Sequence, residues 1–423
     1  MPGATSRRLH GLLIVQAMLF VFLSIPAFAD AAGPPRPLLA AGKPVDWWFV
    51  FKFNATSPFT GCFPPVTGDR KCMFGGEPLT KPPFSQQYAV ASSDNAALES
   101  GAGCLGATKT DPVGATFDQV FNGRYFYVLW NDQFYGDPVV CGRSGNCGKG
   151  WGHSKGMVAW DNKGDGFVMQ VSTPSWPGSG TKRIVRRSGN TLGCLAHNNL
   201  RASQHFFALK LDKGDLLKVL RALKTANAPT KPTELQVVSN GGPDDVRSLV
   251  DELGRRPPPN EQVEIFDETL STNVRLIAKP SRLLVPPWQM LSALLSGAAE
   301  RVVTWRHSKD IPSTRAATKV GCWSPMIAGK PGKVAIALTG VWDGKPIKLT
   351  QPMNHAKIAT ALSNGTKYVV FSDLNQQGSI GPPKPCDSAQ NARGGLFFVL
   401  EDTELYDSLG GLIDGDTEKF KKR

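Results

Sequence analysis

The feature that most constrains this 423-residue chain is a short pattern that occurs twice, once in each half. His153-Ser154-Lys155 and His355-Ala356-Lys357 are each followed by an apolar run, a turn and a second apolar run that ends in polar residues. The turns fall at 161–165 and 363–365. Apolar runs around Gly/Asn/Asp turns are typical of β-hairpins. The chain therefore predicts two similar hairpins.

A proline-rich segment lies between the two patterns. Residues 254–262 contain consecutive prolines, which interrupt strand pairing and favour an extended linker. We expect a leader over 30–45, an N-terminal half over 46–253 with the first motif and a C-terminal half over 263–423 with the second. The length is compatible with two domains or with one domain built from two similar halves.

The first 29 residues have the layout of a secretory signal peptide. Arg7 and Arg8 precede an apolar run over 12–23, and Ala27-Phe28-Ala29 provides small residues for cleavage before Asp30. The apolar run is shorter than the roughly 20 residues of a membrane-spanning helix. We therefore expect an exported protein without stable membrane association.

Local patterns predict a mixed α/β chain. The run 46–53 indicates a buried strand. Helices are expected over 215–227, with Asp215 as the cap, and over 287–302, with Pro287 in the first turn. Further strands are expected at 123–130, 156–160, 166–171, 333–338, 368–371 and 395–400. The predicted fold class is mixed α+β.

All eight cysteines follow residue 29, and an even number in an exported chain favours disulfides. The spacing does not define the pairing, although Cys62/Cys72 and Cys141/Cys147 are each close enough to close a local loop. Zinc is the competing interpretation, but the chain has no Cys-x-x-Cys pair.

The charge favours a polyanionic partner. The formal net charge is +13, and loss of Arg7 and Arg8 with the signal peptide leaves 46 basic against 35 acidic residues, a net charge of +11. Such an excess is typical of proteins that bind nucleic acid or an anionic surface.

The repeated motif suggests a specific chemistry. On a strand, residues i and i+2 point to the same face, so each histidine lies beside its lysine. Two such blocks would surround a phosphodiester with two imidazoles and two ammonium groups. The lysines can neutralise phosphate oxygens, one imidazole can attack phosphorus and the other can protonate the leaving oxygen. The candidate catalytic residues are His153, Lys155, His355 and Lys357. Such a site needs no metal, no cofactor and no 2′-hydroxyl, so DNA is a permitted substrate.

A third triplet, His307-Ser308-Lys309, lacks this context. Pro312 follows closely and no hairpin pattern is present. We therefore interpret His307 as a structural or surface residue.

Two other interpretations of the repeated blocks stay open at this point. The blocks could be basic loops that hold phosphate without reacting, or unrelated hairpins.

Two other functions also stay open. An exported phosphodiesterase acting on lipid headgroups would use the same chemistry. A secreted protein that binds DNA without cutting it is the alternative from a different class.

The ordered set of motifs resembles the deoxyribonuclease II family, whose fold is similar to the phospholipase D superfamily. The resemblance covers about residues 46–400 and rests on the order of the motifs. The segments are Asp46-Trp47-Trp48, Trp130-Asn131-Asp132-Gln133, His153-Ser154-Lys155-Gly156 with Asp161, Ser172-Thr173-Pro174, Thr191-Leu192-Gly193-Cys194, His355-Ala356-Lys357, Ser372-Asp373-Leu374-Asn375 and Arg393-Gly394-Gly395.

The resemblance implies a pseudo-dimeric, phospholipase D-like fold of two similar halves, each with a central sheet flanked by helices and each donating one His-x-Lys motif. It also implies a metal-independent endonuclease that prefers acidic conditions, leaves 3′-phosphate ends and reacts through a phosphohistidine. A histidine pair that needs one protonated and one free ring suits that pH range. The expected compartment is the periplasm or the medium, or the lysosome in an animal.

The chain departs from the family pattern in two places. Ala356 replaces the usual serine, at a position that we expect to point away from the site. The superfamily has an aspartate five residues after the lysine, whereas Asp161 is six after Lys155. As supporting residues we expect Asn375 and Asp373 for the second motif and Ser172 for the first, with Asp161 as a further candidate.

Overall fold

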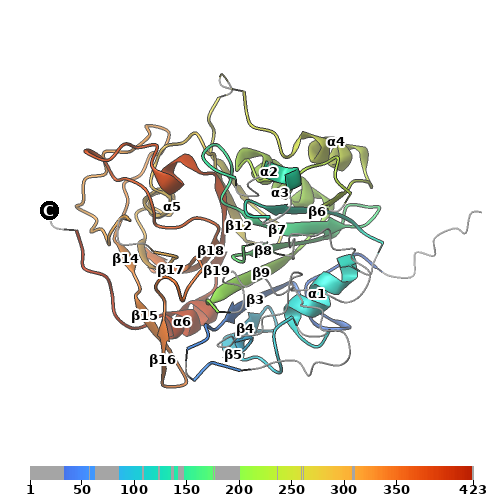
Figure 1. The fold of residues 1–423 in the computed structure, drawn as a ribbon, viewed down its shortest axis with the longest axis horizontal. Coiled ribbons are helices and arrows are strands. Elements are labelled where there is room, and N and C mark those ends of the chain that lie inside the picture. Colours follow the sequence, from blue (N-terminus) through green and yellow to red (C-terminus); the bar gives the residue numbers. More distant parts are fainter. Residues whose placement is uncertain are drawn as a thin grey trace, which may run out of the picture. The chain divides into compact units, whose positions relative to one another are not determined.

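The computed structural model describes thirteen stretches of the chain (Figure 1). They are residues 33–56, 58–61, 85–106, 109–121, 124–134, 138–141, 147–174, 176, 201–235, 237–258, 260, 262–306 and 310–421. The expected signal peptide, Cys62, Cys72, the segment 191–194 and the triplet 307–309 lie outside the described residues.

The first half of the chain forms an eight-stranded sheet with the order β10-β6-β7-β8-β9-β3-β4-β5, in which all neighbours are antiparallel. Its inner strands are mainly apolar and are buried on both faces. The strands are β3 Trp47–Lys52, β4 Tyr88–Ser92, β5 Asn95–Ser100, β6 Phe126–Asn131, β7 Lys155–Trp160, β8 Gly166–Val171, β9 Gln204–Leu211 and β10 Val238–Ser239.

The second half forms a seven-stranded sheet with the order β11-β12-β19-β18-β17-β13-β14. Only the β13–β14 pair at its edge is parallel. The strands are β11 Phe266–Thr269, β12 Arg275–Lys279, β13 Ala299–Val303, β14 Val334–Ile336, β17 Ile358–Ser363, β18 Thr366–Ser372 and β19 Gly395–Glu401. Two small ribbons pair β1 Leu38–Ala40 with β2 Lys43–Pro44, and β15 Thr339–Trp342 with β16 Lys345–Lys348.

The two sheets repeat one strand order. The series β6-β7-β8-β9-β3-β4 of the first sheet corresponds to β13-β17-β18-β19-β12-β11 of the second. In both series a hairpin of two central strands follows the His-x-Lys motif. Buried Lys52 and Lys279 end the corresponding strands β3 and β12, and both ammonium groups donate to backbone carbonyls. The mixed α+β fold class is confirmed, and the two-sheet arrangement is compatible with a pseudo-dimeric fold.

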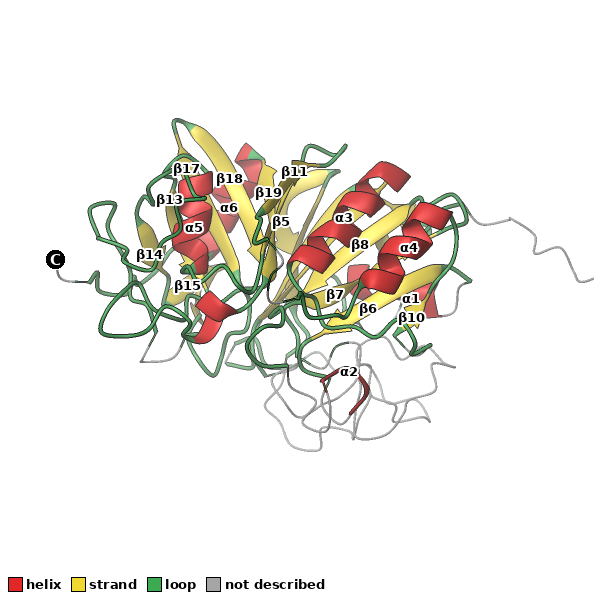
Figure 2. Ribbon diagram, turned by 90° about the horizontal axis from the view of Figure 1, so that it is seen from above, coloured by secondary structure: helices red, strands yellow, loops and turns green. Residues whose placement is uncertain are grey.

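Helices lie against both sheets (Figure 2). The equivalent strands β9 and β19 each lead through an aspartate cap, Asp212 or Asp402, into a helix. The helix after β9 packs against strands of both sheets, and so does the helix after β19. The helices are α1 Pro112–Phe121, α2 Pro138–Cys141, α3 Lys213–Thr225, α4 Asp244–Glu252, α5 Pro287–Leu294, α6 Thr403–Leu412 and the 3-10 helix Ala389–Ala392.

Two helix predictions need correction. The helix expected to start at Asp215 begins at Lys213, because the side chain of Asp212 accepts the N–H of Asp215 as its cap. Asp215 instead accepts hydrogen bonds from Ser271 of the second half. The helix expected over 287–302 ends at Leu294. There Ser296, with φ 57°, and Gly297, with φ 75°, turn the chain into β13.

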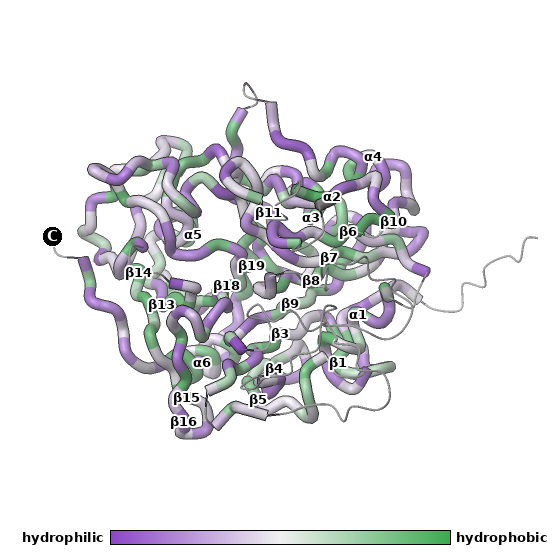
Figure 3. Tube along the Cα trace, viewed as in Figure 1, coloured by the Kyte–Doolittle hydropathy of each residue, from purple (hydrophilic) through white to green (hydrophobic). Residues whose placement is uncertain are grey.

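Aromatic stacking joins the two sheets. The ring of Phe371 in β18 stacks on Phe49 of β3 at 4.6 Å and on Phe207 of β9 at 4.4 Å between centroids. All three side chains are fully buried. Hydrophobic residues mark the inner strands, whereas hydrophilic residues mark the outer loops and α4 (Figure 3). The hydrophobic core is therefore shared by the two halves.

Two disulfides are defined in the described residues. Cys141 is bonded to Cys147, as the short spacing allowed, and Cys322 to Cys386 across 64 residues of sequence. Cys104 is also disulfide-bonded. The Cys62/Cys72 pairing falls outside the described part of the chain. Within that part, no helix has the length and apolar character required to cross a membrane.

Replacing Phe371 tests the shared core. Phe371→Ala removes a ring packed between two others, and we expect the free energy of unfolding to fall by about 3–5 kcal/mol. Leu362→Ala, in the neighbouring strand at 42% exposure, is the control and should change it little. Urea unfolding measures both, and equal effects would contradict the proposed role of the stacked rings.

Candidate active site

The two motifs occupy equivalent positions at the start of the central hairpins. Lys155 is the first residue of β7, and Lys357 immediately precedes β17. β7 pairs antiparallel with β8, and β17 pairs antiparallel with β18. The two predicted hairpins are therefore confirmed.

Each motif is bound to the opposite half by a main-chain hydrogen bond. The N–H of His153 donates to the carbonyl of Gly394 at 2.8 Å, and that of His355 donates to the carbonyl of Ser203 at 2.8 Å. Isolated bridges join Gly152 to Gly394 and Ser203 to Asn354 beside them. These reciprocal contacts attach the start of each hairpin to the other half.

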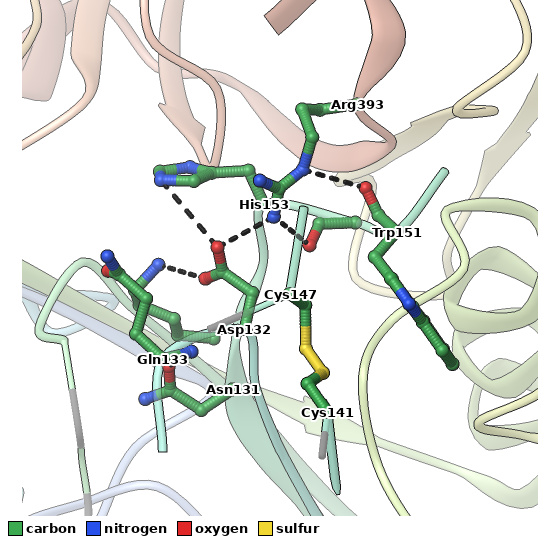
Figure 4. The surroundings of a disulfide bond; sticks show 10 residues. Asn131, Asp132, Gln133, Cys141, Cys147, Trp151, His153 and Arg393 are labelled. Carbon is green, nitrogen blue, oxygen red and sulfur yellow. Dashed lines mark hydrogen bonds and ion pairs between the residues drawn. A yellow bond between two sulfur atoms is a disulfide. The ribbon is translucent and has the colours of Figure 1, made fainter. Parts of the chain in front are cut away.

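A buried carboxylate organises the first motif (Figure 4). Asp132 follows β6 and forms an ion pair with the ammonium of Lys155. Its second oxygen lies 2.7 Å from the guanidinium of Arg393 and 3.9 Å from Nε2 of His153. Burial by itself would raise the pKa of Asp132, but Lys155, His153 and Arg393 outweigh it and hold that pKa below its ordinary value. Asp132 is therefore an ionised counter-charge.

The hydrogen bond at Nδ1 sets the tautomer of His153. This nitrogen lies 2.8 Å from the backbone carbonyl of Asp373, which can only accept, so Nδ1 carries a proton. Burial, and then Lys155, lowers the pKa of His153 well below its usual range despite the opposing charge of Asp132. A neutral ring with the proton on Nδ1 leaves the lone pair on Nε2.

The second motif has different surroundings. The ring of His355 lies against Trp305, with centroids 5.0 Å apart. The N–H of Lys357 donates to Nδ1 of His205 at 3.1 Å. Burial, followed by Lys357, lowers the pKa of His205 well below its usual range, so this ring is neutral. His205 and Trp305 therefore position the second motif.

Electrostatic interactions place residues of both motifs in one cluster. Burial and then Lys155 lower the pKa of Lys357 to about 7, while Asp132 and Asp373 oppose that shift. Lys357 in turn contributes to the low pKa of His153. Lys155 and Lys357, one from each half, therefore interact electrostatically, and His355, two residues before Lys357, is 6% exposed.

Asp373 belongs to the same cluster. Burial raises its pKa to about 7, although hydrogen bonds from Ser154 and from the N–H of Leu396 oppose the shift. Ser154 also accepts the indole N–H of Trp130. Ser154, the middle residue of the first motif, thus contacts both Asp373 and Trp130.

The two halves differ at one equivalent position. Asn131 faces Lys155 across β6 and β7, whereas Val303 faces Ile358 across β13 and β17. In the same register Thr304 falls opposite Lys357, so Trp305 occupies the position that Asp132 has in the first half. The first motif therefore has a counter-charge where the second has an aromatic ring.

Two of the expected supporting residues each support the motif opposite to the one we expected. Asp373, expected beside the second motif, supports the first through His153 and Ser154, although in its ionised form it also acts on Lys357. Ser172, expected beside the first, accepts the N–H of His205 at 2.8 Å and so supports the second.

The other two candidates differ in position. Asn375 is buried, and its Oδ1 lies 3.4 Å from the hydroxyl of Thr304. Thr304 immediately precedes Trp305, the tryptophan that packs on His355. Asp161 accepts the N–H groups of Lys163 and Asp165 in the turn at the far end of β7. The structure therefore does not bring Asp161 to the motifs.

Sequence reasoning missed four residues with clear positions here. Asp132 and Arg393 stood in motifs quoted for the family resemblance, but without a role. His205 and Trp305 carried no sequence signal that distinguished them from other strand and loop residues. Among the described residues, no group of three or more histidine, cysteine, aspartate or glutamate side chains could hold a metal ion.

Comparison with known proteins identifies the family of this chain. The profile of the deoxyribonuclease II family matches residues 78–416, which include both motifs. The chain belongs to the deoxyribonuclease II family, and its class is that of a hydrolytic nuclease. No curated protein sequence matches the chain.

The high pKa of Asp373 predicts a pH-dependent stability. Between about pH 4 and 7 the unfolded chain has this carboxyl ionised while the folded chain keeps it protonated. The resulting stabilisation is complete below the unfolded pKa and is lost as pH rises through the folded pKa. Asp373→Asn does not titrate, so the stability of wild type minus that of the variant should fall from pH 4 to 8.

Urea unfolding across this pH range measures the difference. Asp94→Asn, which removes an exposed carboxyl, is the control. A flat profile for Asp373→Asn would contradict the protonated state of the buried carboxyl.

Proposed function

We propose that this chain is an exported, metal-independent acid endonuclease that hydrolyses DNA to 3′-phosphate ends through a phosphohistidine. The observation that carries the proposal is the electrostatic cluster of Lys155, Lys357 and His153, drawn from both halves, with His355 two residues from Lys357. Membership of the deoxyribonuclease II family supports DNA as the substrate.

In the first step we assign His153 as the nucleophile. Its Nδ1–H is held by the carbonyl of Asp373, so the lone pair of Nε2 is available for attack on phosphorus. As the N–P bond forms, the bond from phosphorus to the 5′-oxygen breaks, and protonated His355 gives its proton to that oxygen. Lys155 and Lys357 stabilise the charge on the non-bridging oxygens.

In the second step His355 acts as a base. It removes a proton from water as the water oxygen attacks phosphorus, and the N–P bond breaks to release His153 and a 3′-phosphate. The positive charge that develops on His153 during catalysis is stabilised by Asp132, whose carboxylate lies 3.9 Å from Nε2. His355 returns to the protonated form that starts the next cycle.

The buried charges support an acidic optimum. Below about pH 7 Lys357 is an ammonium ion and Asp373 a neutral acid, so the site presents its greatest positive charge to a phosphate. Above that pH, Lys357 loses its charge and Asp373 gains one. His355 must also carry a proton to act as the acid. All three changes lower activity as pH rises.

The remaining assignments complete the proposal. Residues 1–29 act as the signal peptide and 30–45 as a leader. The halves 46–253 and 263–423 are joined by the linker 254–262. The mature protein works in the periplasm or the medium, or in the lysosome of an animal, and binds DNA without stable membrane association or cofactor.

A substrate with a good leaving group separates the two histidine roles. Thymidine 3′-(p-nitrophenyl phosphate) loses p-nitrophenol without help from an acid. At pH 5 in excess EDTA, His355→Ala should release about one equivalent of p-nitrophenol per enzyme and then stall at the phosphohistidine. His153→Ala should release none, and both variants should fail to nick plasmid DNA while still binding it.

His307→Ala is the matched control, because its triplet lacks the hairpin context, and it should retain wild-type nicking. A burst from His153→Ala with none from His355→Ala would reverse the role assignment. Unchanged plasmid nicking by either variant would exclude the mechanism, and wild-type cleavage of phospholipid headgroups but not of plasmid would exclude DNA as the substrate.

A further inference from the structure

A basic groove lies beside the candidate active site. It has a volume of about 830 Å³ and is lined by α3, α4, the linker and the segment before α5. Among the described residues that line it are four arginines and one lysine, against two glutamates. The basic residues are Arg221, Lys224, Arg255, Arg256 and Arg282.

Part of this positive charge, that of Arg221 and Arg255, is exposed to solvent. Glu252 pairs with Lys224 at 2.6 Å, which removes one charge of each sign. Arg221 and Arg255 are exposed and form no ion pair with any residue in the described stretches. Arg282 donates to the carbonyl of Pro258. Among the described residues that line the groove, the basic side chains therefore outnumber the acidic ones.

The groove wall contacts the residues that precede the first motif. Asn227 lines the groove, and its backbone carbonyl accepts the N–H of Gly152 at 2.8 Å, one residue before His153. The guanidinium of Arg256 lies 5.4 Å from the centroid of the Trp151 ring, within the range of a cation–π contact. The carbonyl of Trp151 accepts a bond from Arg393, the partner of Asp132. The groove wall therefore adjoins the loop that precedes His153.

We propose that this groove binds the sugar-phosphate backbone of the DNA strand that flanks the scissile bond. The inference rests on the proposed function, since it extends the substrate from one phosphodiester to a polymer. Guanidinium groups can hold phosphates in bidentate contacts, and a row of them binds successive phosphates with release of counterions. The proline-rich linker then forms part of the substrate surface in addition to joining the halves.

Neutralising two arginines tests the groove. In the double variant Arg221→Gln/Arg255→Gln, the slope of log binding constant against log salt for a duplex oligonucleotide should fall in magnitude by about 2, because each lost phosphate contact removes roughly 0.9. The KM for plasmid should rise about tenfold. Turnover of thymidine 3′-(p-nitrophenyl phosphate), which is too short to reach the groove, should stay at the wild-type value.

The control removes the same charge elsewhere. Lys43→Gln/Lys345→Gln replaces two exposed lysines outside the groove and should leave the salt slope and the KM unchanged. Equal effects in both double variants, or none in the groove variant, would overturn the proposal. The proposal would also be overturned if the groove variant bound phosphatidylglycerol vesicles more weakly than the wild type while its binding to DNA was unchanged.

Failure of the groove proposal can be distinguished from failure of the proposed nuclease function. If the wild type cleaved neither plasmid nor the nucleotide ester, the nuclease proposal would fail. The salt slope of oligonucleotide binding would still decide whether the groove holds a nucleic acid backbone.

Discussion

The reciprocal hydrogen bonds between the two halves are the constraint on which the site depends. His153 donates to Gly394 and His355 donates to Ser203, so neither motif is positioned by its own half alone. The two sheets also pack together through the stacked rings of Phe49, Phe207 and Phe371. A repeated strand order makes these contacts equivalent, because each central hairpin starts at the same place in its sheet.

Although the two sheets repeat one strand order, the two motifs have different neighbours. Asp132 offsets the buried charges of Lys155 and Arg393, and such compensation is needed because an unpaired buried charge costs several kcal/mol. The equivalent position in the second half is Trp305, which contacts the ring of His355 and adds no charge. A neutral His153 next to a carboxylate and a His355 without that neighbour are suited to different steps of one reaction. The asymmetry is the physical basis for the roles that we propose.

The sequence predicted the hairpins well and the tertiary contacts poorly. Apolar runs bounded by Gly/Asn/Asp turns defined β7–β8 and β17–β18 to within about two residues. The helix expected over 287–302 was too long, because nothing in the composition indicates that Ser296 adopts a left-handed conformation. The partner of Lys155 was not predictable from spacing, since Asp132 reaches it through strand pairing. The crossed positions of Asp373 and Ser172 depend on how the halves pack, which local patterns do not describe.

The central claim is that the two motifs hold one phosphate between them. A crystal structure with orthovanadate, a phosphate analogue that can bond to an imidazole nitrogen, tests it most directly. We predict vanadium bonded to Nε2 of His153, with the ammonium groups of Lys155 and Lys357 on its oxygens and His355 on the opposite side. Vanadate bound to one motif alone, with the other histidine ring out of contact, would contradict the account.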